Sequence, residues 1–378
     1  MSISRRNFLR NSVAAAAAVP FLEHISFDYC HAAETGTTHL VDFKLGYPIG
    51  AIRLNLNENP FGPSAMAVQA VKKGLSEANR YVIPPTQLRK ALADLHDVDE
   101  KMIRLGTGSG EILSAVPLAY LRDGGNLVTT LETYRVTPRT AEKIGAKVKW
   151  IKLRPDWSYD VNGLLGAVDS ETKILYMVNP NNPTGTTLNY DELESIADAL
   201  PKDVLFFIDE AYVHFLPDGK NGVDLFKSGH DNVFITRTFS KVYGLAGLRI
   251  GYGVGHPDVI NKVAGSMFTM MNTAGFGGAI AALHDHAHIE KFLAHAKKCR
   301  SFYKKELSAL DLKYIIGNSP LLMVEVGQDS KTFAEKMAKE NVFIRKGEDW
   351  DMPTHVRISF GLDDQNKAAI GALKKLLI

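Results

Sequence analysis

From about residue 100 onward, the chain alternates short apolar runs with longer helix-like segments. The runs expected to form buried strands are 148–153, 174–178, 204–208, 233–236 and 248–254. Turn or helix signals bound each run, and this alternation is typical of an α/β sheet with helices on both faces. We therefore expect an α/β fold, and we expect ligands to bind beyond the carboxyl ends of its strands.

The pattern changes after about residue 275. A long helix is expected through Lys304, followed by strands near 322–326 and 356–360 with a helix between them. A chain of 378 residues with 45% hydrophobic content can bury two cores. We expect a large domain over 61–275 and a smaller α+β domain built from 34–60 and 276–378.

Charge and cysteine content exclude several classes of function. The formal net charge is only +2, from 44 basic and 42 acidic residues, so we expect no nucleic-acid partner. Cys30 and Cys299 have neither metal-ligand nor redox spacing. His284, His286 and His288 are better explained by a solvated helix face than by a metal site, so no metal is expected.

The first 33 residues differ from the rest of the chain. A basic stretch with paired Arg5 and Arg6 precedes an apolar run over 13–22 and small residues near Ala33. This order is typical of a twin-arginine export signal, although a basic disordered N-terminus is the alternative. The run is too short for a permanent membrane anchor. We expect the twin-arginine machinery as a partner, cleavage near Ala33 and a periplasmic or otherwise exported protein.

Four expected strands end in chemically unusual residues. Asp209 and Glu210 follow one strand, an amide-rich turn over 179–185 follows another, and a third leads into a segment ending at Lys241. The fourth leads into the glycine-rich turn 106–110, which opens an apolar helix. Backbone N–H groups at such a turn can cradle a phosphate.

A dinucleotide-binding site is a competing interpretation of this glycine-rich turn. Glu132 lies at roughly the expected distance of twenty residues for a ribose-binding acid. However, Glu111 replaces the third glycine of that fingerprint, and the Lys241 region would stay unexplained. A Walker phosphate loop is excluded because no glycine-lysine-hydroxyl sequence follows at the required spacing.

Lys241 is the central candidate for chemistry. A lysine whose pKa is lowered by its surroundings can attack a carbonyl as a free amine, whereas a surface lysine would do nothing of the kind. Its neighbours Thr238, Ser240 and Arg249 suit a phosphate, and Asp209 could hold a ring nitrogen protonated. Together these residues favour a cofactor that carries an aldehyde, a ring nitrogen and a phosphate.

The strings LNLNENPFGPS, NPNNPTG, DEAY, TFSK and GLAGLRIGYG occur in this order from residue 54 to residue 253. From about residue 45 to the C-terminus the chain resembles the fold-type I pyridoxal-phosphate (PLP) aminotransferases, specifically the histidinol-phosphate aminotransferase group. The resemblance implies a mostly parallel seven-stranded sheet, a smaller domain, a homodimer and PLP as cofactor. It also implies amino transfer between an amino acid, or an amino-alcohol phosphate such as histidinol phosphate, and a 2-oxo acid.

The resemblance also implies roles for individual residues. Lys241 would bind PLP as a Schiff base and move the proton, Asp209 would pair with the ring nitrogen, and Asn182 and Tyr212 would hydrogen-bond the ring oxygen. Tyr134 would stack on the ring, and Tyr81 would reach the cofactor of the neighbouring subunit. The remaining cofactor residues, around the phosphate, would be Gly108, Ser109, Gly110, Thr238, Ser240 and Arg249.

For the substrate, Arg357 is similar to the family arginine that grips an α-carboxylate. Arg345 would bind a substrate phosphate or form an ordinary surface salt bridge, and Tyr47 and Asn57 would line the pocket. Gly110, Glu132 and Val82 depart from the usual family residues. The export signal does not suit a histidine-pathway enzyme, so the substrate stays open. A decarboxylase of the threonine-phosphate type and a PLP-binding amino-acid sensor without turnover are the alternatives.

Overall fold

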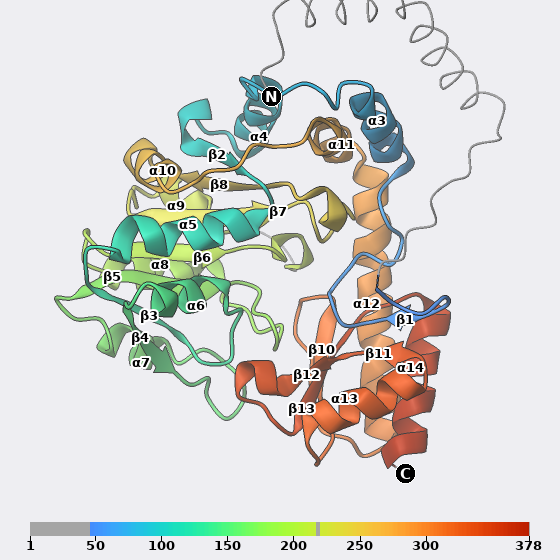
Figure 1. Ribbon diagram of the computed structural model, residues 1–378. Coiled ribbons are helices and arrows are strands. Elements are labelled where there is room, and N and C mark those ends of the chain that lie inside the picture. Colours follow the sequence, from blue (N-terminus) through green and yellow to red (C-terminus); the bar gives the residue numbers. More distant parts are fainter. Residues whose placement is uncertain (1–45, 217–219, 378) are drawn as a thin grey trace, which may run out of the picture. The chain divides into compact units, whose positions relative to one another are not determined.

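The computed structural model describes residues 46–216 and 220–377 (Figure 1). The chain divides between Ile49 and Gly50, and the unit Gly50–Ile378 contains the sheets described below. The expected export signal over 1–33 lies outside the described residues. Within the described part of the chain, no helix has the length and apolar character needed to cross a membrane.

A seven-stranded sheet forms the centre of the large domain, in the order β2-β8-β7-β6-β5-β3-β4. Neighbours pair in parallel from β4 to β7, whereas β8 is antiparallel to both β2 and β7. The sheet is therefore mostly parallel, as expected. Its strands are β2 (Ile103–Gly106), β3 (Asn126–Thr130), β4 (Lys147–Ile151), β5 (Thr172–Val178), β6 (Leu205–Asp209), β7 (Val233–Thr238) and β8 (Gly251–Gly255).

One expected strand begins later than its apolar run. Residues 248–254 were expected to be extended, but Ala246–Leu248 form a 3-10 turn (η3) and Arg249 adopts a left-handed φ of 56°. Strand β8 therefore starts only at Gly251. The turn brings Arg249 back toward the start of the helix that follows β2, where it contributes to the site.

Alternate residues of the central strands pack into two separate cores. Leu127, Tyr176 and Phe207 belong to one core, and their neighbours Val128, Met177 and Phe206 belong to the other. The first core is covered by α5 (Ser109–Leu121), α6 (Val136–Lys143) and α10 (Pro257–Ala264). The second is covered by α4 (Thr86–His96), α7 (Val161–Gly166), α8 (Tyr190–Ala199) and α9 (Asp224–Lys227). Both faces are thus buried, which explains the continuously apolar strands.

The smaller domain contains a four-stranded antiparallel sheet in the order β12-β13-β10-β9. Its strands are β9 (Tyr314–Ile315), β10 (Leu321–Glu325), β12 (Arg345–Lys346) and β13 (His355–Ser359), with α13 (Ser330–Lys339) and α14 (Asp363–Leu377). A separate parallel pair joins β1 (Ile52–Arg53) to β11 (Val342–Phe343), so residues distant in sequence meet here. The expected domain boundaries stay a prediction.

The expected long helix after residue 275 is two helices. These are α11 (Thr273–Leu283) and α12 (His286–Ala309), which are separated at His284 and Asp285. Asp285 caps α12 by accepting a hydrogen bond from His288 N at 3.2 Å. Helix α3 (Ala65–Leu75) packs on α11. The remaining short elements are the 3-10 turns η1 (Glu100–Met102), η2 (Val213–Phe215) and η4 (Gly347–Trp350).

Candidate active site

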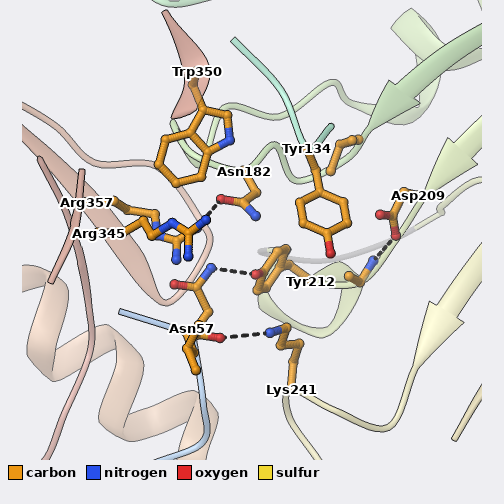
Figure 2. Close-up of a pocket in the computed structure, with 12 residues that line it drawn as sticks. Asn57, Tyr134, Asn182, Asp209, Tyr212, Lys241, Arg345, Trp350 and Arg357 are labelled. Atoms are coloured by element: carbon orange, nitrogen blue, oxygen red, sulfur yellow. Dashed lines mark hydrogen bonds between the residues drawn. The ribbon is translucent and has the colours of Figure 1, made fainter. Parts of the chain in front are cut away.

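A cavity of about 240 Å³ lies at the carboxyl ends of β5 and β6 (Figure 2). Residues from both sheets surround it, because β12, β13 and η4 face the ends of the large-sheet strands there. Its lining residues are Leu56, Asn57, Tyr134, Val178, Asn182, Asp209, Ala211, Tyr212, Lys241, Arg345, Trp350 and Arg357. Eight of the predicted site residues therefore line one cavity, although they are spread over 300 positions of the sequence.

Asp209 is the last residue of β6 and is buried. Its Oδ1 accepts hydrogen bonds from Ala211 N at 3.1 Å and from Thr236 Oγ1 at 3.3 Å. Burial raises the pKa of Asp209 to about 7, against the lowering effect of these hydrogen bonds. No cationic side chain of residues 46–216 and 220–377 forms an ion pair with it. A buried carboxyl of this kind suits a protonated ring nitrogen.

Lys241 projects its amine into the same cavity. Its Nζ donates a hydrogen bond to Leu56 O at 3.2 Å and lies 5.8 Å from the ring centroid of Tyr212. Burial, and then the charge of Arg357, lowers the pKa of Lys241 to about 8. The neutral amine is therefore accessible near neutral pH, as a nucleophile or proton acceptor requires.

Asn57 and Tyr212 form a rigid pair on the wall of the cavity. Asn57 Nδ2 donates to Tyr212 Oη at 2.7 Å, and Ser359 Oγ on β13 donates to Asn57 Oδ1 at 2.7 Å. Burial raises the pKa of Tyr212 above its ordinary value, so its hydroxyl stays protonated and can donate. Asn57, which follows β1, and Ser359 on β13 thus fix the orientation of the Tyr212 side chain.

A buried ion pair supports the end of β6 from behind. Arg237 Nη2 lies 2.7 Å from Glu210 Oε2, and Glu210 Oε1 accepts a hydrogen bond from Gly222 N at 2.7 Å. Both charges are paired and hydrogen-bonded, so the Glu210 carboxylate already has its partners outside the cavity. Of the two adjacent acids, only Asp209 faces the pocket.

The predicted phosphate-binding residues gather beside the start of α5. Gly108 precedes the helix with φ of 74° and offers no side-chain cap, so the first N–H groups of α5 remain for a ligand. A Cβ on Gly108 would lie 2.3 Å from Arg249 Nη2, and one on Gly251 would lie 2.2 Å from Ser109 N. Only glycine therefore lets the turn, Arg249 and β8 approach this closely.

Two hydroxyls complete this cradle. Thr238 Oγ1 donates to Ser240 Oγ at 2.9 Å and accepts from Ser240 N at 3.1 Å. Both side chains are buried at the end of β7, one turn before Lys241. Backbone donors, hydroxyls and a guanidinium are a donor set that fits a phosphate dianion.

Arg357 is a buried cation that has no carboxylate partner within the described ranges. Its Nη1 donates to Asn182 Oδ1 at 2.7 Å and its Nη2 donates to Asn55 O at 2.6 Å. Its Nε is buried without a partner, and its guanidinium lies 4.8 Å from the ring of Trp350. Burial lowers the pKa of Arg357 to about 10, so the side chain stays charged at neutral pH. The buried charge of Arg357 therefore has room for one carboxylate counterion, which the described part of the chain does not supply.

Arg345 lines the cavity and also forms a salt bridge. It is the cross-strand partner of Arg357 on β12, and its Nε lies 2.5 Å from Asp349 Oδ2. Arg345 therefore lies where it could contact a substrate phosphate, and it also forms a salt bridge, which was the alternative interpretation from the sequence. Trp350, which follows Asp349, was not predicted as a site residue. Its place in the sequence between the two arginines was the available signal.

Two predicted residues lie elsewhere. Tyr81 is 79% exposed and is not part of the cavity lining. Tyr47 belongs to the N-terminal unit Met1–Ile49, and its expected place in the pocket stays a prediction. Among the described residues, which include His284, His286 and His288, no three His, Cys, Asp or Glu side chains are grouped so that they could hold a metal ion.

The fold and the cavity together define a class of protein. A mostly parallel seven-stranded sheet carries, at one edge, an amine of lowered pKa, a buried carboxyl and a phosphate cradle. These groups fit the aldehyde, ring nitrogen and phosphate of PLP. The site is that of a fold-type I PLP enzyme.

Residues 49–373 match the family described as aminotransferase class I and II, and the chain belongs to this family. It is 34% identical to histidinol-phosphate aminotransferase 2 of Pseudomonas aeruginosa, over 87% of this chain and 90% of that protein. It is 33% identical to histidinol-phosphate aminotransferase 1 of Nitrosococcus oceani, over 91% of this chain and 96% of that protein.

A solved structure of histidinol-phosphate aminotransferase from Sinorhizobium meliloti in complex with PLP is also similar. It is 27% identical with a TM-score of 0.78, over 86% of this chain and 90% of that chain. The expected fold, the PLP cofactor and aminotransferase activity are thereby confirmed. The roles of the individual site residues, which the resemblance implies, remain predictions.

Proposed function

We propose that this aminotransferase takes the amino group of an α-amino acid and delivers it to a 2-oxo acid, binding the carboxylate of each on Arg357. The observation that carries this proposal is the buried Arg357 guanidinium, which has two neutral partners and no acid within the described ranges. A carboxylate on its free side would make charge-assisted hydrogen bonds and remove the cost of an uncompensated buried charge.

The other side chains act on the cofactor and on one proton. When bound, PLP supplies an aldehyde that receives the amino group and a ring that withdraws electrons. Asp209 would hold the ring nitrogen protonated, and Tyr212 and the Asn182 amide would donate hydrogen bonds to the ring oxygen. Tyr134 would cover one face of the ring. The amine of Lys241 would move the proton to and from the substrate carbon, because its lowered pKa leaves it partly neutral.

A phosphorylated amine such as histidinol phosphate is a second candidate substrate. It is favoured by the names of the relatives at 33–34% identity and by Arg345, a cation on the cavity wall. A substrate of this kind lacks the α-carboxylate, so its phosphate would have to compensate the arginines instead. Adding a panel of α-amino acids and phosphorylated amines to the PLP-loaded enzyme, one at a time, would distinguish the two candidates.

The test uses the purified holoenzyme and the Lys241→Ala variant. Wild type should show the visible absorption of bound PLP and lose it on adding an active amino donor, while a 2-oxo acid appears. Lys241→Ala should lose the covalent link and at least about a thousandfold in turnover. Lys202→Ala, at an exposed position, is the control.

Three other results would contradict the proposal. Release of carbon dioxide without 2-oxo acid would indicate a decarboxylase. Binding of amino acids without loss of the visible band would indicate a sensor. Failure of the purified protein to bind PLP would remove the basis of the assignment.

We also propose a homodimer in which Tyr81 reaches the cofactor phosphate of the neighbouring subunit. Tyr81 and Ile83 are 79% and 66% exposed, and such apolar exposure is typical of an interface. Sedimentation should show a dimer, and Tyr81→Phe should weaken PLP binding several-fold without changing the mass of the assembly. A monomer with full PLP affinity would exclude this arrangement.

We also propose that residues 1–33 are a twin-arginine signal that directs export to the periplasm. This route moves folded proteins, so PLP could be inserted before transport. Cell fractionation should find the shortened chain outside the cytoplasm, and substituting Arg5 and Arg6 by lysine should retain it inside. An uncleaved chain found only in the cytoplasm would refute export.

A further inference from the structure

Two arginines face each other across one strand pair at the wall of the cavity. Arg345 on β12 and Arg357 on β13 are direct antiparallel partners, and Figure 2 shows their guanidinium groups close together beneath the ring of Trp350. Like charges at directly opposite positions destabilise a sheet unless they are compensated. The two side chains differ in how this compensation is provided.

The positive charge of Arg345 is compensated by an acid of the protein itself. Arg345 Nε lies 2.5 Å from Asp349 Oδ2, and the Asp349 side chain is only 19% exposed. Asp349 sits four residues along the chain in η4, so the pair forms within one short segment. Arg357 has no such acid in the described part of the chain, and it awaits the carboxylate of a substrate.

Two acids near Asp349 in the sequence also pair with cations beside the pocket. Glu348 pairs with Lys346 at 2.7 Å, and Asp351 pairs with Arg135, which adjoins Tyr134 of the cavity. Three acids within four residues therefore compensate three cations beside the pocket. Arg357, by contrast, forms no ion pair with an acid in the described part of the chain.

This distribution of charge has a consequence for substrates. An α-carboxylate on Arg357 completes the charge balance of the wall. A further anionic group near Arg345 would lie beside the Asp349 carboxylate, and it would have to displace that carboxylate or be repelled by it. An uncharged side chain would instead contact Trp350, Tyr134, Leu56 and Val178, which line the same cavity.

We propose that Asp349 makes this enzyme select amino acids whose side chain carries no second anionic group, because it holds Arg345 as its own counterion. Asp349 is thus a specificity-determining residue. The inference rests on the proposed function, in which Arg357 binds the α-carboxylate. It also ranks the two candidate substrate classes, since a phosphorylated amine would compete with Asp349 for Arg345.

The test compares ligands that differ only in the distal charge. Binding of glutarate and of its monoamide, glutaramate, to the PLP-loaded protein is measured by calorimetry, and kcat/KM is measured for glutamate and for glutamine. Wild type should favour the amide of each pair. Asp349→Asn should tighten glutarate and raise kcat/KM for glutamate by about tenfold, with glutaramate and glutamine changed less than about twofold.

Two further variants isolate the cause. Glu348→Gln removes the neighbouring acid, which pairs with Lys346, and should leave both ratios at their wild-type values. In an Arg345→Gln background, Asp349→Asn should change both ratios less than it does in wild type, because freeing Arg345 no longer contributes and only the lost repulsion remains. A ratio unchanged by Asp349→Asn, or shifted further toward the amides, would overturn the proposal.

Failure of the proposed function would look different. If neither glutarate nor glutaramate bound, or if Arg357→Lys left their binding unchanged, then Arg357 would not hold the carboxylate and both proposals would fall. If Arg357→Lys weakened both ligands but Asp349→Asn left their ratio unchanged, the selectivity inference alone would be wrong.

Discussion

Arg357 Nη1 donates a hydrogen bond of 2.7 Å to Asn182 Oδ1, which joins β13 of the smaller domain to the turn after β5 of the large sheet. The acceptor is neutral, so the bond orients the guanidinium without cancelling its charge. It also leaves the amide nitrogen of Asn182 to face the cavity. One contact therefore couples the substrate side of the pocket to its cofactor side.

Replacing Arg357 by lysine should weaken substrate binding more than cofactor binding. Lysine keeps the charge but loses the planar fork, so kcat/KM for an amino donor should fall by roughly a hundredfold while PLP absorption is retained. Arg300→Lys is a matched control, because Arg300 likewise donates to two neutral oxygens, the backbone carbonyls of Gly317 and Asn318, away from the cavity. Steady-state kinetics on both variants checks the prediction, and equal losses would contradict it.

Asp209 should make the PLP-free protein less stable as the pH rises. Its folded pKa of about 7 lies above the ordinary value of 3.8, so the folded state holds a proton that the unfolded state has lost. Stability should decline between about pH 4 and pH 7, by up to about 4 kcal/mol.

Denaturant unfolding of the PLP-free protein at pH 5 and pH 8 measures this decline. Asp209→Asn should lack that component of the decline, and Asp203→Asn, at an exposed position, should retain it. Bound PLP should reverse the effect in wild type, since a protonated ring nitrogen stabilises the ionised carboxylate. Identical pH profiles for wild type and Asp209→Asn would show that the pKa of Asp209 is not raised in the folded protein.

Lys241 should control the pH dependence of PLP addition to the PLP-free protein. Only the neutral amine attacks the aldehyde, and the pKa of Lys241 is lowered to about 8. The rate should therefore rise about tenfold per pH unit below pH 8 and level off above it. Stopped-flow absorbance follows the reaction, with a small-molecule lysine derivative, whose rate keeps rising toward pH 10, as the reference. A protein rate that follows the reference would contradict the lowered pKa.

Gly108→Ala should open the phosphate cradle. The added methyl group would lie 2.3 Å from Arg249 Nη2, so the guanidinium must move away, and the dissociation constant of PLP should rise by about tenfold or more. Gly145→Ala is the control, because Gly145 also has a positive φ, of 84°, but open space around it. Both substitutions place a residue other than glycine at a positive φ. Similar PLP affinity in the two variants would show that the approach of Arg249 is unimportant.

Much of the cofactor site could be predicted from the sequence because its residues lie directly after strands. Asp209 ends a run of apolar residues, and Asn182, Thr238 and Lys241 follow two others. In a mostly parallel sheet such positions meet at one edge, whatever the loops do between them. The start of β8 could not be placed, because the left-handed turn at Arg249 depends on what it packs against rather than on local propensity.

The order of the apolar runs and the residues after them by itself determined an α/β sheet with an amine, an acid and a phosphate cradle at one edge. Only the tertiary structure decided the substrate side. Arg357 faces Asn182 across 175 positions of sequence, and Arg345 is paired with Asp349 on a wall shared with Trp350. Strand-end positions follow from periodicity along the chain, whereas burial, cross-strand pairing and the choice of counterion arise only when distant segments pack together.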